Sequence, residues 1–273
     1  MKPSTDFIVF PLPLNEKEDC HMNLLKEHLN NKQFILGTML SEITTPNVIR
    51  MLKGGGFSYI ILDCEHGYFD YSQAAALIGI ANGIQLPIIV RIPEIRREVI
   101  TKYMDMGADG LLVPMTNTKE DIEKVIQFAK YAPIGQRGIS TQRAHTEYNP
   151  PALSDYMKLA NSRTIILAQI ETNEGVRNVR NILSVEGVDA ALIGPNDMAC
   201  DCGTPGDFYT PLMQDNISAV IDGAKELNKP SGIIASNISF LKECRQKGMT
   251  VFSCNSETGI ILSGAKRIVN EFN

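Results

Sequence analysis

The segment "YIILDCEHGYFD", residues 59–70, places charged side chains directly after a run of apolar residues. The run Tyr59–Leu62 is typical of a buried strand. Asp63, Glu65 and His66 follow it at once, although acids are rarely buried unless a cation or hydrogen-bond donors pair with them. A histidine titrates near neutral pH and can serve as a general acid or base. This strand end is therefore a candidate catalytic position, with a purely structural histidine as the alternative.

Two further acids, Glu171 in "LAQIET" and Asp197 in "LIGPNDM", also follow apolar runs. Two carboxylates on neighbouring strand ends can bind a hard divalent cation and leave positions for water or a chelating substrate. So few protein ligands suit Mg²⁺ or Mn²⁺ better than a tetrahedral zinc site. A salt bridge from Glu171 to an arginine such as Arg91 is the structural alternative. Residues Gly194, Pro195, Asn196 and Asp197 precede a predicted helix, where backbone N–H groups can bind a carboxylate; a plain turn is equally compatible.

The elements that carry these residues alternate regularly along the chain. Segments with helical spacing separate nearly continuous apolar runs, which are typical of parallel strands covered on both faces. The eight runs span residues 35–40, 59–62, 87–92, 110–115, 164–170, 190–193, 231–235 and 250–254. Eight strand–helix units in a chain of this length predict an α/β fold, the (β/α)8 TIM barrel. A doubly wound sheet is the competitor, but its GxGxxG fingerprint is missing. Gly54-Gly55-Gly56 precedes a strand and is interpreted as a helix cap.

In a TIM barrel the carboxyl ends of the strands meet at one mouth, where the active site lies. The polar residues of this sequence collect at those ends, whereas the opposite ends carry mainly glycine and small residues. Besides the acids and His66, the strand ends bear Arg91, Gln169, Asn196 and the segment "SCNSE". We therefore expect these side chains to form one site.

Bulk properties narrow the class of protein. The chain has 273 residues and a formal net charge of −5, without a basic stripe for nucleic acid. No apolar stretch approaches the roughly 20 residues of a membrane span, and no signal-peptide pattern opens the chain. Six scattered cysteines are interpreted as inert thiols in a reducing cytoplasm. We predict an N-terminal extension, residues 1–22, and one barrel domain, residues 23–273. The connection over residues 132–152 is long enough to be functional.

Seven motifs follow one another between Gly37 and Met198: "GTML", "FSYIILDCEHGYFD", "VRIP", "MGADGLLVPM", "GQRGIS", "AQIET" and "VDAALIGPNDM". Together they resemble the HpcH/HpaI family of class II, metal-dependent pyruvate aldolases, of the 2-keto-3-deoxy sugar acid or 4-hydroxy-2-oxo acid type. The barrel rhythm extends the likeness to the C-terminus. The resemblance implies a barrel of the phosphoenolpyruvate/pyruvate superfamily and a carbon–carbon lyase that produces pyruvate and an aldehyde.

The resemblance also implies a role for each site residue. Glu171 and Asp197 would bind the divalent metal, Mg²⁺, Mn²⁺ or Co²⁺, which the 2-oxo acid chelates. His66 would be the general base, acting through water and oriented by Asp105, and Arg91 would stabilise the enolate oxygen. The substrate carboxylate would lie on the amides of Asn196 and Asp197, in the segment that Gly194 and Pro195 open, and Gln169 would line the same pocket.

Two departures from the family pattern concern the surroundings of the substrate. The family often has tryptophan where this chain has Met39, and a small residue where it has Asn196. Both departures bear on the aldehyde partner and leave the metal ligands unchanged. The resemblance further implies a homo-oligomer, trimer or hexamer, with exchanged C-terminal helices. The segment "TGIILSGAKRIVNEF" is equally compatible with closing its own barrel.

Other functions compete with the aldolase. An oxaloacetate decarboxylase or a citrate-type condensing enzyme would use the same enolate site. A CoA-thioester lyase is less well supported because no nucleotide-binding extension follows the barrel. A barrel retained only for binding or assembly predicts a broken metal or base position, yet His66, Arg91, Glu171 and Asp197 are all present.

Overall fold

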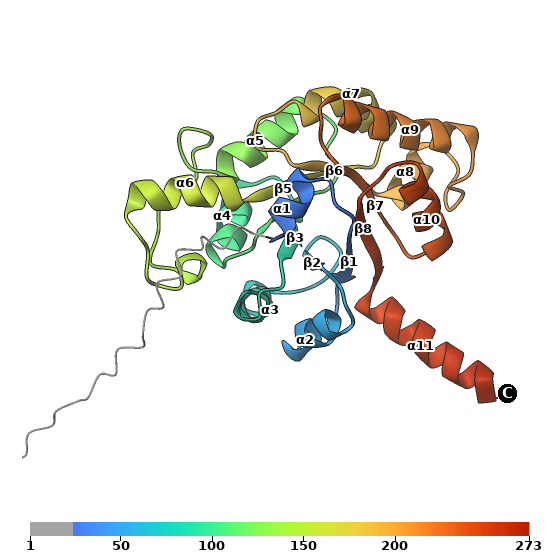
Figure 1. The fold of residues 1–273 in the computed structure, drawn as a ribbon, viewed down its shortest axis with the longest axis horizontal. Coiled ribbons are helices and arrows are strands. Elements are labelled where there is room, and N and C mark those ends of the chain that lie inside the picture. The colour runs from blue at the N-terminus through green and yellow to red at the C-terminus, as the bar shows by residue number, and fades with distance from the viewer. Residues whose placement is uncertain (1–23, 273) are drawn as a thin grey trace, which may run out of the picture.

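Eight parallel strands close into a barrel in which each strand pairs with the next one in sequence and the eighth pairs with the first (Figure 1). The computed structural model describes residues 24–272, so the predicted extension of residues 1–22 lies outside the described residues. The strands are β1 (Ile35–Leu40), β2 (Tyr59–Asp63), β3 (Ile88–Arg91), β4 (Gly110–Val113), β5 (Ile165–Ile170), β6 (Ala190–Ile193), β7 (Ser231–Ala235) and β8 (Val251–Ser256). Each falls on one of the predicted runs, and the (β/α)8 barrel is confirmed.

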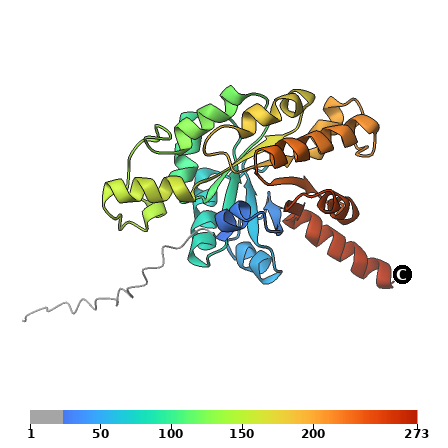
Figure 2. The ribbon, with the colours of Figure 1, turned by 45° about the horizontal axis from the view of Figure 1, so that its top comes forward.

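Helices follow the strands and surround the barrel (Figure 2). They are α1 (Leu24–Asn30), α2 (Asn47–Gly54), α3 (Tyr71–Gly83), α4 (Arg97–Asp105), α5 (Lys119–Ala129), α6 (Leu153–Arg163), α7 (Asn173–Leu183), α8 (Pro195–Asp201), α9 (Pro211–Glu226), α10 (Ile238–Gln246) and α11 (Glu257–Phe272). In α5 the helical spacing of the apolar residues puts Ile122, Val125, Ile126 and Ala129 on one stripe, and all four are buried. The long connection over residues 132–152 contains only the short 3₁₀ helix η1 (Ala144–Thr146) as regular structure.

The core has two layers, as the continuous apolar strands require. Alternate strand residues such as Ile61, Leu112 and Leu192 fill the barrel interior, and Leu25 and Leu29 of α1 belong to the same cluster. Because α1 leads into β1, it covers the end of the barrel where the strands begin. The larger layer lies between the outside of the sheet and the helices. The mouth at the opposite end is therefore the end left open for a site.

Four glycines at helix-to-strand turns adopt the left-handed conformation that is typical of helix caps. Gly56, Gly107, Gly187 and Gly248 have φ angles of 94°, 97°, 92° and 109°. A side chain at these positions would be strained, whereas glycine is not. The cap interpretation of the triple glycine at residues 54–56 thus holds for its last member.

The last helix, α11, does not close its own barrel. It leaves the end of β8 and extends away from the other elements (Figures 1 and 2). Glu257, its first residue, is the only one of its described residues that is buried. Ile260 packs partly against the core, but most of the helix's other apolar side chains lie in solvent, and Ile261, Leu262, Ile268 and Val269 are each more than half exposed. Over residues 24–272, no helix is both long and apolar enough to cross a bilayer.

Candidate active site

The charged residues after β2 pair with the end of β3. Asp63 and Arg91 are the last residues of these strands and lie opposite each other in the sheet register. The Asp63 carboxylate accepts hydrogen bonds from Arg91 Nε at 2.9 Å and Nη2 at 2.6 Å. It also accepts the backbone N–H groups of Glu65 and His66 at 3.1 and 3.2 Å. One buried acid thus holds both the guanidinium and the turn that carries His66.

Burial by itself would raise the pKa of Asp63, but the hydrogen bond and charge of Arg91 outweigh it and keep this pKa below its ordinary value. Asp63 is therefore ionised at neutral pH. The ion pair explains how a strand so apolar can end in an acid, because the buried charge is compensated on the spot.

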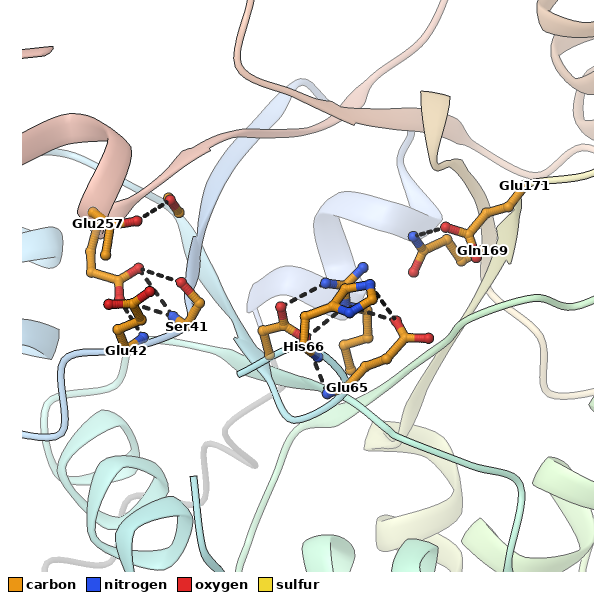
Figure 3. A network of polar contacts seen from close by, with 11 residues as sticks. Ser41, Glu42, Glu65, His66, Gln169, Glu171 and Glu257 are labelled. Carbon is orange, nitrogen blue, oxygen red and sulfur yellow. Dashed lines mark hydrogen bonds and ion pairs between the residues drawn. The ribbon is translucent and has the colours of Figure 1, made fainter. Parts of the chain in front are cut away.

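Glu65 and His66 lie further out at the mouth. Glu65 Oε2 is 3.4 Å from Arg91 Nε and 3.9 Å from His66 Nε2. Burial is the main cause that raises the pKa of Glu65, and the neighbouring acids Asp63 and Asp197 add to it. The His66 side chain is 70% exposed, so a substrate at the mouth can reach it. Figure 3 shows both residues between the Ser41–Glu257 group and the Gln169–Glu171 pair.

Glu171 follows β5 and is buried. Its Oε1 accepts a hydrogen bond from Gln169 Nε2 at 2.5 Å, and its Oε2 accepts one from the backbone N–H of Met115 at 2.8 Å. Burial, together with the charges of Asp197 and Glu65, raises the pKa of Glu171 to about 7. A buried carboxylate with a raised pKa and other acids around it favours a cation at this position.

Asp197 lies in the first turn of α8, which begins at Pro195 directly after Gly194. Its side chain is exposed, and its charge acts on both Glu171 and Glu65. A Cβ atom at Gly194 would lie 2.2 Å from Glu171 Oε1. Only glycine therefore allows the backbone before α8 to approach the Glu171 carboxylate so closely.

The donor set suits a hydrated hard cation better than a site made wholly of protein ligands. Among residues 24–272 no three His, Cys, Asp or Glu side chains are grouped so that they could hold a metal. The candidate ligands are the two carboxylates of Glu171 and Asp197. Mg²⁺ usually binds one or two carboxylates and keeps several waters. The buried Gln169 Oε1 accepts no hydrogen bond from any of residues 24–272. It is therefore available as an acceptor for a bound water. The residues present fit a divalent cation.

Asp105 is the one predicted site residue that lies elsewhere. It ends α4, which runs from the mouth back to the end of the barrel where β4 begins. There its Oδ1 is 2.5 Å from Arg137 Nη2, and its backbone oxygen is 3.1 Å from His145 Nδ1. The helix between β3 and β4 separates Asp105 from the β2 end, so the structure does not bring Asp105 to His66 within one chain.

Met115 is a site residue that sequence reasoning missed. It has a φ of 48°, in the left-handed region that non-glycine residues rarely adopt, and its N–H reaches Glu171 in this conformation. Its contribution comes from the backbone, which residue type does not reveal. The role of Asp63 as anchor was also missed, although its place among the strand-end acids was the available signal.

Comparisons with known proteins agree with the observed fold. A family model described as HpcH/HpaI aldolase/citrate lyase matches residues 38–263. The 5-keto-4-deoxy-D-glucarate aldolase of Escherichia coli O157:H7 is 30% identical over 254 residues, which cover 93% of this chain and 98% of that protein. The crystal structure of an HpcH/HpaI aldolase from Desulfitobacterium hafniense superimposes with a TM-score of 0.87 at 26% identity, covering 91% and 96% of the two chains. The crystal structure of the citrate synthase SbnG superimposes with a TM-score of 0.81 at 25% identity, covering 90% and 96% of the two chains.

Proposed function

Because this chain belongs to the HpcH/HpaI aldolase/citrate lyase family, we propose that it is a metal-dependent aldolase that cleaves or forms a 4-hydroxy-2-oxo acid, with pyruvate and an aldehyde as partners. The observation that carries the proposal is that two sets of charged side chains lie at the same mouth of the barrel. The cationic Arg91 and the accessible His66 lie on one side, and the acids Glu171 and Asp197 lie on the other.

Glu171 and Asp197 would hold the divalent cation, Mg²⁺ or Mn²⁺, with Co²⁺ as a further candidate. When bound, the cation supplies a Lewis acid that polarises the keto oxygen of a 2-oxo acid. Gln169 would accept a hydrogen bond from a water or substrate hydroxyl beside Glu171. The first N–H groups of a helix have no intrahelical acceptor, so the amides of Asn196 and Asp197 would bind the substrate carboxylate.

His66 would move the proton of the substrate, taking it through water from the methyl group of pyruvate during condensation. Removal of that proton places negative charge on the keto oxygen, where positive charge must already be in position. Arg91 meets this need because Asp63 holds its guanidinium in place before substrate binds. The imidazole of His66 is free to approach the substrate because most of it is exposed.

The reaction is tested most directly by solvent deuterium exchange into the methyl group of pyruvate, followed by NMR. We expect exchange when Mg²⁺ or Mn²⁺ is added and none in the presence of a chelator, because deprotonation requires the polarised keto group. The assay needs no knowledge of the aldehyde. Absence of exchange under both conditions would contradict the proposal and favour a different acyl substrate or a non-catalytic barrel.

A citrate-type condensation or an oxaloacetate decarboxylation would use the same residues. The likeness to a citrate synthase at 25% identity is the observation that supports the condensation as an alternative. Product analysis with pyruvate plus aldehydes against oxaloacetate separates the reactions, since decarboxylation releases CO₂ from oxaloacetate without an aldehyde.

We also propose that the protein assembles as a homo-oligomer, a trimer or hexamer, through exchange of α11. The helix exposes an apolar face formed by Ile261, Leu262, Ile268, Val269 and Phe272, and exposed patches of this kind mark interaction surfaces. An apolar groove lies where α11 would otherwise cover its own barrel. Its lining residues are Phe34, Leu36, Ile238, Leu241, Lys242, Arg245, Phe252 and Cys254.

Placing aspartate on this face should break the assembly. We expect the double variant Ile261→Asp/Ile268→Asp to have a smaller mass than wild type in size-exclusion chromatography with light scattering, because two charges about two helical turns apart on one face cannot be buried without partners. Lys266→Asp, on the same helix, is the control that should keep the wild-type mass. An unchanged mass for the double variant would exclude α11 as the main contact.

Within such an oligomer, Asp105 could orient His66 only from a neighbouring subunit, since the two lie apart in one chain. A mixture of His66→Ala and Asp105→Ala subunits tests this arrangement. Partial recovery of activity after co-refolding would support a shared site, and no recovery would remove Asp105 from the role that the family resemblance implied.

A further inference from the structure

Glu257, the first residue of α11, is a buried acid at the mouth that the proposed reaction does not use. It is only 2% exposed. Its Oε1 accepts the backbone N–H groups of Ser41, Glu42 and Ile43 at 3.0, 2.6 and 3.1 Å. Its Oε2 accepts from the Ser41 N–H at 3.0 Å and from the Ser41 hydroxyl at 3.3 Å. One carboxylate thus satisfies three successive amides of the loop after β1 (Figure 3).

These hydrogen bonds have a charged acceptor, so each is stronger than a bond between neutral groups. The loop has no other regular structure before α2 begins at Asn47. Without the carboxylate, three partly buried hydrogen bonds to the N–H groups of Ser41, Glu42 and Ile43 would be lost at once, which is costly where water does not replace them. The conformation of residues 41–43 therefore depends on Glu257.

The same loop packs directly on the turn that carries His66. A Cβ atom at Gly67 would lie 2.6 Å from the Ser41 carbonyl oxygen and 2.2 Å from that of Asp63. Backbone is thus pressed against backbone at this point, and only glycine leaves room for it. The residue before Gly67 is His66, and its N–H is held by Asp63 from the other side. The His66 turn lies between two supports, Asp63 below it and the Ser41–Ile43 loop beside it.

We propose that Glu257 is a positioning residue for the reaction, holding the Ser41–Ile43 loop against the Glu65–Gly67 turn and so fixing the place of His66. This inference rests on the proposed function, in which His66 moves the proton. It does not involve the metal ligands, which follow β5 and β6 on the other side of the mouth. Loss of Glu257 should therefore lower the rate of proton transfer and leave cation binding unchanged.

Two measurements on the full-length protein test the inference, and only one of them depends on activity. Amide hydrogen exchange, followed by mass spectrometry, reports on peptides that contain residues 41–43 and 65–67. Kinetic analysis of pyruvate methyl exchange reports kcat and KM separately, and calorimetry reports Mg²⁺ or Mn²⁺ affinity. The variants are Glu257→Ala, the size-conserving Glu257→Gln, and Glu271→Ala as a control on the same helix, where the side chain is 71% exposed.

For Glu257→Ala we expect faster amide exchange at both peptides and a fall in kcat of about 10²-fold, the cost of misplacing a reacting group by about 1 Å. The KM for pyruvate and the cation affinity should stay near wild type. Glu257→Gln keeps one oxygen as acceptor and should recover part of kcat. Glu271→Ala should behave as wild type in every measurement.

Unchanged amide exchange at residues 65–67 in Glu257→Ala would overturn the inference, whether or not the wild-type protein acts on pyruvate. Faster exchange there with unchanged kcat would also overturn it, since Glu257 would then stabilise the loop without serving the reaction. Absence of pyruvate exchange in the wild type would instead contradict the proposed function, so the two failures are distinguishable.

Discussion

Replacing Glu171 by glutamine is expected to abolish divalent-cation binding and turnover together. Glu171 would be one of only two carboxylates that hold the cation, and glutamine is a neutral, weaker ligand for a hard metal. Loss of a residue that merely supports a ligand already costs about 10–100-fold in affinity, so we expect the ligand itself to cost more than about 10²-fold. Titration calorimetry with Mn²⁺ and the pyruvate exchange assay measure the two effects on the same protein.

The matched control is Glu174→Gln, an exposed acid in the first turn of α7, which should bind the cation as wild type does. Wild-type affinity and activity in Glu171→Gln would contradict the ligand assignment. In that case the raised pKa of Glu171 would have to reflect burial among other acids alone.

In metal-free protein, Glu171 should make the free energy of unfolding depend on pH, and Glu171→Gln should remove this dependence. The folded-state pKa of Glu171, about 7, lies above its ordinary value of 4.5. Its contribution to stability is therefore fully present below about pH 4.5 and is lost as pH rises through about 7, which amounts to roughly 3 kcal/mol. Urea unfolding of chelated protein should show this decline in the difference between wild type and Glu171→Gln, and added Mg²⁺ should reverse it above pH 7.

Replacing His66 by alanine is expected to lower pyruvate methyl exchange by about 10²–10⁴-fold, the usual cost of losing a general base. Because the side chain is 70% exposed and its nearest charged partner is Glu65, which is not a proposed cation ligand, cation affinity and folding should stay as in wild type. Exchange kinetics, calorimetry and thermal unfolding of the one variant separate these effects.

His28→Ala serves as the control, since this histidine lies in α1 at the opposite end of the barrel. Full activity in His66→Ala would show that another group is the general base. Glu65 would be the next candidate, because burial raises its pKa. Loss of cation binding in His66→Ala would instead show that the turn after β2 supports the metal site.

The fold and most of the mouth could be predicted from the sequence. A parallel barrel buries both faces of its strands, so continuous apolar runs such as 59–62 and 190–193 indicate where the strands lie. The left-handed caps at helix ends favour glycine, as at Gly107 and Gly187. Because all eight strands end at one mouth, the sequence places the residues after them, among them His66, Arg91, Glu171 and Asp197, at that mouth. Their roles there stay predictions.

Only the tertiary structure decided which of these residues touch. The pairing of Asp63 with Arg91 depends on the register between β2 and β3, and the Met115 amide reaches Glu171 through a backbone angle that residue type does not encode. Asp105 is separated from His66 because α4 ends at the other end of the barrel, where Asp105 binds Arg137. The direction of α11 away from the barrel is likewise a property of the tertiary structure. Strand ends are local properties of a sequence, whereas contacts between them, such as that of Glu257 with the loop after β1, depend on how distant segments close around the barrel.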